Sequence, residues 1–242
     1  MIRRLVELGR KAKKMTALQI NGLLMPSDFP RELFEKIYTA AQPHSANPAH
    51  PQFIGAWSAV SHRYKALAHY DEVFTRTIET HGPGPASEVR YEQERDLFGF
   101  ASNAYSVFEA FHYAMFAIGS LINPNIFVLK TPDDEKKVNI QNTRSKYSNA
   151  FPSDQILILF KEFFDDPARD ELATLRHLLT HRAVPPRAFG LVIGAGDAKP
   201  SAEITRVNIS LDKNITKSRR AEASRLLTMC LQGAETFVAS KL

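Results

Sequence analysis

The segment Gly82-Pro83-Gly84-Pro85 constrains the fold most, because it separates two long stretches with helical apolar periodicity. In residues 52–81, large apolar side chains recur every three or four positions, which is typical of an amphipathic helix. The second stretch begins near residues 86–88 and runs to Ile122, where Asn123-Pro124 ends it. Two prolines and two glycines in succession cannot continue a helix. The sequence therefore predicts two long helices, with an N-terminal helical layer ending at this break.

Shorter patterns predict the remaining elements. Further helices are expected over residues 31–42, 153–164, 166–182 and 213–242, two strands over 189–193 and 203–211 with a turn at 194–200, and a polar loop with a short helical piece over 131–148. The predicted fold is mainly α. A helical extension, residues 1–82, packs on a helical bundle, residues 86–242, and one small β-hairpin at about 188–211 precedes the last helix.

The composition favours a soluble, reduced protein with an anionic partner. A chain of 242 residues with 44% hydrophobic content can bury an ordinary core. A formal net charge of +5 mildly favours RNA, DNA, nucleotides or a membrane surface. The single cysteine, Cys230, excludes an internal disulfide and a multi-cysteine zinc site, which fits the cytoplasm. Residues 2–19 are basic and lack an apolar signal core, so they predict a solvated helix face or an arm for nucleic acid or membrane.

One segment is long and apolar enough to require a membrane test. Residues 97–122 carry a single formal charge, Glu109, and this length is sufficient to span a bilayer. The segment also contains Asn103 and His112, polar groups that a lone lipid-facing span avoids. We therefore expect a buried central helix and no membrane association.

The most informative motif is Arg176-His177-x3-His181, near the end of the helix predicted for residues 166–182. Asp166 is placed to cap that helix, and Pro167 follows at the first helical position, where its missing N–H costs little. Pro185-Pro186 prevents the helix from continuing. Residues five apart on a helix diverge by about 140°. Arg176 and His181 can therefore meet at one ligand only if the helix frays or bends before the prolines.

This pattern resembles the HEPN (higher eukaryotes and prokaryotes nucleotide-binding) domain family, on the Arg-x4-His spacing with a polar residue after the arginine. The resemblance covers roughly residues 88–242 and also takes in Arg182 and Arg187. It implies a dimeric α-helical bundle without a cofactor. It further implies a metal-independent endoribonuclease, in which the substrate's 2′-hydroxyl attacks the adjacent phosphate. His177 departs from the more common asparagine, which leaves activity open.

The resemblance also implies residue roles. His181 is expected to be the general acid or base, because imidazole titrates near neutral pH. Arg176 is expected to hold the phosphate and stabilise developing charge, and His177 to orient the phosphate or its neighbour. Glu109 is expected to be buried and to need a partner, for which Arg176 is one candidate. Glu109 and His112 also form a Glu-x-x-His pair, but a di-iron bundle requires two copies and further glutamates.

Two simpler explanations compete with this reading. Basic residues in the last helical turn complement the helix dipole by roughly 0.3–1 kcal/mol each, without any catalytic role. The chain is alternatively a non-catalytic HEPN-like module that binds a nucleotide or a protein partner, as in toxin–antitoxin or defence systems.

A second basic cluster lies at the start of the last predicted helix. It comprises Lys213, Lys217, Arg219, Arg220 and Arg225. Positive charge at a helix start opposes the helix dipole, so local helix stability does not explain it. Either the cluster pairs with carboxylates elsewhere in the fold, or it extends an RNA-binding groove in which Lys217, Arg219, Arg220, Arg182 and Arg187 contact phosphate.

Overall fold

The computed structural model is mainly α-helical and describes residues 19–20, 22–180, 187–192, 199–204 and 209–242. Its helices are α2 (Arg31–Ala41), a 3-10 turn η1 (Gln42–His44), α3 (His50–His81), α4 (Ser87–Ile122), α5 (Pro132–Lys136), α6 (Ile140–Ala150), α7 (Ile156–Asp165), α8 (Pro167–Thr180) and α9 (Asn214–Lys241). The strands are β1 (Gln19–Ile20), β2 (Leu23–Leu24), β3 (Arg187–Val192), β4 (Lys199–Ile204) and β5 (Ile209–Ser210).

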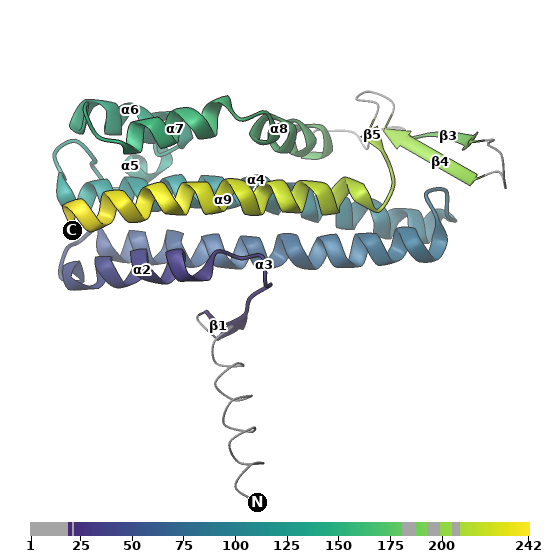
Figure 1. Cartoon of the computed structure of the whole chain (residues 1–242), viewed down its shortest axis with the longest axis horizontal. Coiled ribbons are helices and arrows are strands. Elements are labelled where there is room, and N and C mark those ends of the chain that lie inside the picture. The colour runs from purple at the N-terminus through teal and green to yellow at the C-terminus, as the bar shows by residue number, and fades with distance from the viewer. Residues whose placement is uncertain (1–18, 21, 181–186, 193–198, 205–208) are drawn as a thin grey trace, which may run out of the picture.

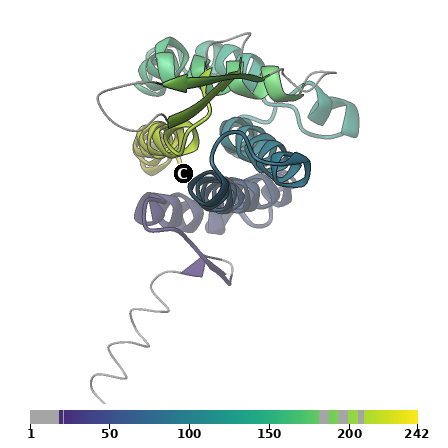
Figure 2. The same cartoon turned by 90° about the vertical axis from the view of Figure 1, so that its right-hand side faces the viewer.

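Three long helices, α3, α4 and α9, run along the longest axis of the molecule (Figure 1). Viewed end-on, α2 and α3 form one layer, α4 and α9 form the next, and α6, α7 and α8 form the third (Figure 2). One continuous hydrophobic core extends from Ile20 to Val238 and includes side chains of all three layers. The N-terminal helices thus share their core with the helices that follow. The division into an extension and a bundle stays a prediction.

The predicted break between the two long helices is confirmed. Gly82 ends α3 with φ of +70°, a conformation that favours glycine, and its N–H donates to the Ile78 carbonyl at 2.9 Å. The helices α3 and α4 then pack closely along their length. A Cβ built on Gly99 of α4 lies 2.5 Å from the Tyr70 ring of α3, so this approach requires a residue without a side chain.

The predicted central helix is also confirmed. The second half of α4 is buried on nearly every side, including Phe108, Phe111, Met115 and Ile118. No helix among the described residues combines the length and the apolar character that crossing a membrane requires.

The segment 131–148, expected to be a loop with a short helical piece, contains two helices and is more helical than predicted. Thr131 and Asp134 form a reciprocal capping box at the start of α5. Asn139 caps α6 by accepting a hydrogen bond from the Asn142 N–H at 2.8 Å. The Tyr147 hydroxyl of α6 donates to the Met115 carbonyl of α4 at 2.7 Å. Capping and a few buried side chains therefore stabilise helices in a segment whose composition is mostly polar.

The predicted hairpin is instead a three-stranded antiparallel sheet in the order β3-β4-β5. The strand expected over residues 203–211 is divided, since Glu203 and Ile204 belong to β4 and pair with Ser210 and Ile209 of β5. The sheet covers a second, smaller core that includes Phe74 and Leu97, near the link between α3 and α4. Residues 2–18 of the predicted N-terminal helix lie outside the described residues.

Candidate functional site

Local sequence signals place Arg176 on α8, as predicted. The Asp166 carboxylate accepts a hydrogen bond from the Ala168 N–H at 3.0 Å, and Pro167 is the first residue of the helix. Leu172 and Leu175 are 1% exposed and anchor one side of α8 in the core. Arg176 follows the second of these leucines, so its side chain leaves the helix at the border between core and solvent.

The Arg176 guanidinium lies between two side chains of α4. Its Nη1 donates to Glu109 Oε1 at 2.8 Å, and its Cζ lies 5.2 Å from the centre of the Tyr105 ring. The Ser106 hydroxyl donates to the other oxygen of Glu109 at 3.1 Å. These contacts hold the arginine against α4 in one orientation.

Both members of this ion pair are accessible to solvent. The side chains of Arg176 and Glu109 are 35% and 42% exposed. The expectation that Glu109 is buried is therefore wrong, although its partner is the suggested Arg176. The reason is that Glu109 lies on the side of α4 that faces a pocket and not on the side that packs into the core.

His177 follows Arg176 on the exposed side of α8, in its last turn. His181 and Arg182 lie outside the described residues. The convergence of Arg176 and His181 thus stays a prediction.

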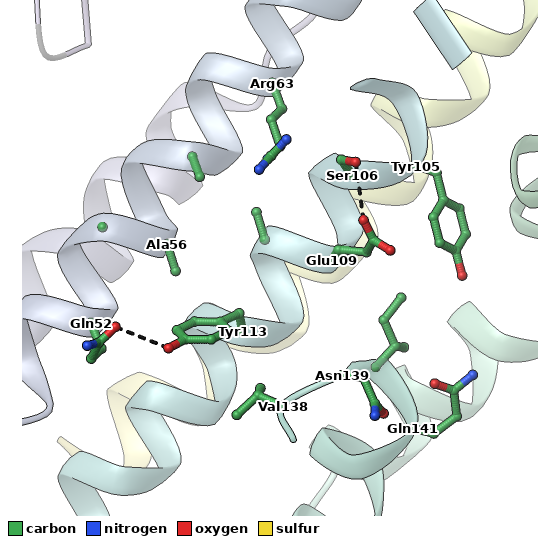
Figure 3. Close-up of a pocket in the computed structure, with 14 residues that line it drawn as sticks. Gln52, Ala56, Arg63, Tyr105, Ser106, Glu109, Tyr113, Val138, Asn139 and Gln141 are labelled. Atoms are coloured by element: carbon green, nitrogen blue, oxygen red, sulfur yellow. Dashed lines mark hydrogen bonds between the residues drawn. The ribbon is translucent and has the colours of Figure 1, made fainter. Parts of the chain in front are cut away.

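A pocket of about 490 Å³ opens beside Glu109, between α3, α4 and the start of α6 (Figure 3). Small residues of α3 and α4 make room for it: Gly55, Ala56, Ala59 and Ala110. Polar and aromatic side chains surround this space: Gln52, Arg63, Tyr105, Ser106, Glu109, Tyr113, Asn139 and Gln141. The Tyr113 hydroxyl donates to Gln52 Oε1 at 3.1 Å, which fixes both groups at one end.

Two arginines at or next to this pocket were not predicted. Arg63 extends from α3 toward Ser106 and Glu109 (Figure 3). Arg169 lies two turns before Arg176 on α8, with Nη2 3.5 Å from the Tyr105 hydroxyl. The seven-residue spacing of Arg169 and Arg176 is the one sequence signal that indicates a shared helix face.

The basic cluster at the start of α9 is mostly paired within the fold. Arg220 contacts Asp28 at 2.8 Å and Asp71 at 3.1 Å, and its side chain is only 17% exposed. Arg225 contacts Asp166 at 2.9 Å, Arg219 contacts Glu171 at 3.5 Å, and Lys213 contacts Glu79 at 3.4 Å. Lys217 is exposed and pairs with no described carboxylate. Pairing across the fold, one of the two explanations for this cluster, thus accounts for four of its five cations.

Arg187 points into the protein instead of toward solvent. Its side chain is 3% exposed, donates to Gln93 Oε1 at 3.0 Å and lies 3.4 Å from Glu94. Burial lowers the pKa of its guanidinium, and the charge of Glu94 opposes that change. Arg187 therefore holds β3 against α4 through these contacts. Because its side chain is buried, it cannot reach a phosphate on the surface.

His112 and Glu109 do not converge on a common point. The His112 ring is fully buried against Phe111, Phe160 and Phe163, and its Nδ1 lies 2.8 Å from the Phe108 carbonyl oxygen. Burial lowers the pKa of His112 to about 4, so the ring is neutral at pH 7. Burial also raises the pKa of the Cys230 thiol, which makes it a core group without nucleophilic character.

Comparison of the chain with models of known protein families, with curated proteins and with solved structures gives no match. The function proposed below therefore depends on the chain's own residues and on the motif resemblance.

Proposed function

We propose that this protein is a metal-independent endoribonuclease of the HEPN type, in which Arg176 and His181 form the reacting pair. The observation that carries the proposal is the setting of Arg176. It lies near the end of a helix, is partly exposed, and is held against α4 by Glu109 and Tyr105. An arginine oriented in this way can accept a phosphate without first being ordered, which favours transition-state binding.

The reaction needs no group beyond these side chains and the RNA. The substrate's 2′-hydroxyl attacks the neighbouring phosphorus, giving a 2′,3′-cyclic phosphate and a free 5′-hydroxyl. His181 takes the proton from the 2′-hydroxyl and returns one to the leaving 5′-oxygen, and Arg176 stabilises the charge on the phosphate oxygens. Glu109 acts as a positioning residue for Arg176, and His177 orients the phosphate. Two chains related by a two-fold axis bring two such pairs to one cleft.

The RNA-contacting surface in this proposal differs from the one expected from the sequence. Lys217 keeps its role, because it is exposed and has no described counter-charge. Arg219 and Arg220 already contact carboxylates, so replacing them by glutamate would disturb the fold and confuse a binding experiment. Lys217→Glu tests the surface more cleanly, and we expect it to weaken RNA binding most at low salt.

The deciding experiment is cleavage of a labelled RNA in EDTA by wild type, Arg176→Ala and His181→Ala. Arg76→Ala is the matched control, since Arg76 is exposed on α3 and contacts no described carboxylate. Loss of cleavage in both site variants but not in the control, with 2′,3′-cyclic phosphate ends on the products, supports the proposal.

The pocket beside Glu109 favours a second candidate, a non-catalytic HEPN-like module that binds a nucleotide or a protein. Under this candidate, pure wild type binds its partner without cutting RNA at any enzyme concentration. Cleavage equal in wild type and in His181→Ala would contradict the nuclease proposal, because the activity would then come from elsewhere.

A further inference from the structure

The pocket beside Glu109 contains a positive charge that the described part of the fold does not neutralise. Arg63 lines the pocket, is exposed, and contacts no described carboxylate or hydrogen-bond acceptor. Glu109, by contrast, already accepts hydrogen bonds from Arg176 at 2.8 Å and from Ser106 at 3.1 Å. With Arg176 balancing Glu109, Arg63 leaves the pocket with an excess positive charge that suits an anion.

The remaining walls suit a flat ring more than a bare ion. Tyr105 and Tyr113 lie on one side of α4, about 12 Å apart along the helix axis. Across from them, Gly55, Ala56 and Ala59 give α3 a surface without bulky side chains. A ring can therefore lie between the helices and contact a tyrosine on one side.

Hydrogen-bonding groups at the far end of the pocket are oriented. Tyr113 donates to Gln52 Oε1, and Gln52 Nε2 donates to Glu135 Oε1 at 2.7 Å. Burial, and secondarily the charge of Glu135, raises the pKa of the Tyr113 hydroxyl, so it remains a neutral donor. Fixed polar groups of this kind set the orientation of a small ligand in a pocket.

We infer that this pocket is a binding site for a small molecule that carries a planar ring and one anionic group, carboxylate or phosphate, with the anion on Arg63 and the ring between α3 and α4. The inference goes beyond the proposed nuclease and does not depend on it, because it uses neither His181 nor cleavage of RNA. It deepens the second candidate, since it names the chemical class of ligand that the pocket would bind.

The structure offers a variant that fills the pocket without crowding the fold. A Cβ built on Gly55 meets no atom within 4 Å, and Gly55 lies inside helix α3. Gly55→Leu therefore places a side chain in the pocket while removing a residue that disfavours helix. Arg63→Gln removes the positive charge and keeps a polar side chain that is only somewhat shorter. Arg76→Gln is the control, an exposed arginine of the same helix that does not line the pocket.

The experiment is a calorimetric titration of the full chain with phenyl phosphate, benzoate and benzamidine, a cation of similar shape. We expect phenyl phosphate or benzoate to bind with about millimolar affinity or better, and benzamidine not to bind. The two anions distinguish a phosphate ligand from a carboxylate ligand. Arg63→Gln should weaken the affinity for the anion roughly ten-fold or more. Gly55→Leu should abolish binding with an unchanged or higher melting temperature, and Arg76→Gln should behave as wild type.

Three results would overturn the inference. They are no binding of either anion, benzamidine bound as well as the anions, or anion binding unchanged in Arg63→Gln. The last of these does not depend on Gly55→Leu folding, because Arg63 is exposed and its replacement leaves the core intact. If the protein cleaves RNA but binds neither anion, the proposed ligand site is refuted and the nuclease is not. If it binds an anion but does not cleave RNA, the nuclease is refuted and the ligand site is not.

Discussion

The arginines at the start of α9 and the arginines around the pocket are alike in type and different in setting. At the start of α9, Arg220 lies between Asp28 and Asp71 and is mostly buried. Around the pocket, Arg63 contacts no described carboxylate. Arg176 pairs with Glu109, whose side chain is itself 42% exposed. The first group joins distant parts of the chain, whereas the second leaves positive charge accessible. A basic residue therefore indicates a ligand site only where it stays accessible, either without a described counter-charge or with one that is itself exposed to solvent.

The largest expected effect comes from breaking the α9 group. Arg220→Met leaves Asp28 and Asp71 without their counter-charge, and we expect a loss of about 3–5 kcal/mol in the free energy of unfolding. Chemical denaturation at pH 7 measures it. Lys217→Met is the matched control, because Lys217 is exposed on the same helix; its effect should stay within about 0.5 kcal/mol. Equal stabilities of the two variants would remove the distinction between paired and free cations.

The second effect concerns His112, a titratable group of α4 that is fully buried. The folded pKa of His112 is about 4, below the 6.5 of an ordinary histidine, because of burial and the nearby charge of Arg169. Between these pH values the unfolded chain binds a proton that the folded chain does not. Stability should therefore fall as the pH drops from about 6.5 to 4, by up to about 3 kcal/mol from this group alone.

His112→Leu should remove this part of the acid sensitivity. Denaturation of wild type and variant at pH 7 and pH 5 isolates it, since the other titrating groups are common to both proteins. If both proteins lose the same stability between these pH values, His112 does not stay neutral in the folded state.

A third, smaller effect concerns Asp166, where a helix cap and an ion pair meet. The carboxylate caps α8 and also contacts Arg225 of α9. Asp166→Ala should cost about 1 kcal/mol, with the cap as the main contribution. Arg225→Ala should cost less, because Arg225 is 49% exposed and the Asp166 carboxylate keeps its hydrogen bond from the Ala168 N–H. Thermal denaturation of both variants measures the difference, and equal losses would assign the whole effect to the ion pair.

The sequence predicts the long helices well because their signals are local. The periodicity of residues 52–81, the break at Gly82–Pro85 and the Asp166-Pro167 helix start all act within a few residues. The segment of α5 and α6 was expected to contain only a short helical piece. Both helices begin with local capping side chains, but α6 is also stabilised by packing against α4, which the sequence pattern does not specify. The division of residues 203–211 between β4 and β5 depends on pairing within the sheet, which apolar alternation does not specify.

The candidate site is less predictable than the fold because it is made of contacts between distant residues. Arg220 and Asp28 are 192 positions apart, and Arg176 and Glu109 are 67 positions apart. Charge counts along the chain cannot tell which of these arginines finds a carboxylate. The role of Arg63 likewise depends on the small residues beside it and on the start of α6, which only the fold brings together.

Glu109→Gln should cause the smallest change in stability. It also tests most directly the difference between the arginines at the start of α9 and those around the pocket. The Arg176–Glu109 pair is largely exposed on both sides, so its loss should change the free energy of unfolding by less than about 1 kcal/mol. The same substitution releases the positive charge of Arg176. In a His181→Ala background, which prevents cleavage under the proposed mechanism, RNA should then bind more tightly. The dependence of log affinity on log salt should steepen by about 0.7, the contribution of one further phosphate contact on a single strand.

Binding and cleavage should respond in opposite directions to this one change. Without the His181 substitution, Glu109→Gln should reduce cleavage even as RNA binds more tightly, because Glu109 holds Arg176 at Tyr105 and in one orientation. Filter binding at several salt concentrations and single-turnover cleavage measure the two quantities separately. A fall in both would mean that Glu109 itself contacts the RNA. No change in either would place Arg176 outside the RNA path and reduce the pair to a surface contact between α4 and α8.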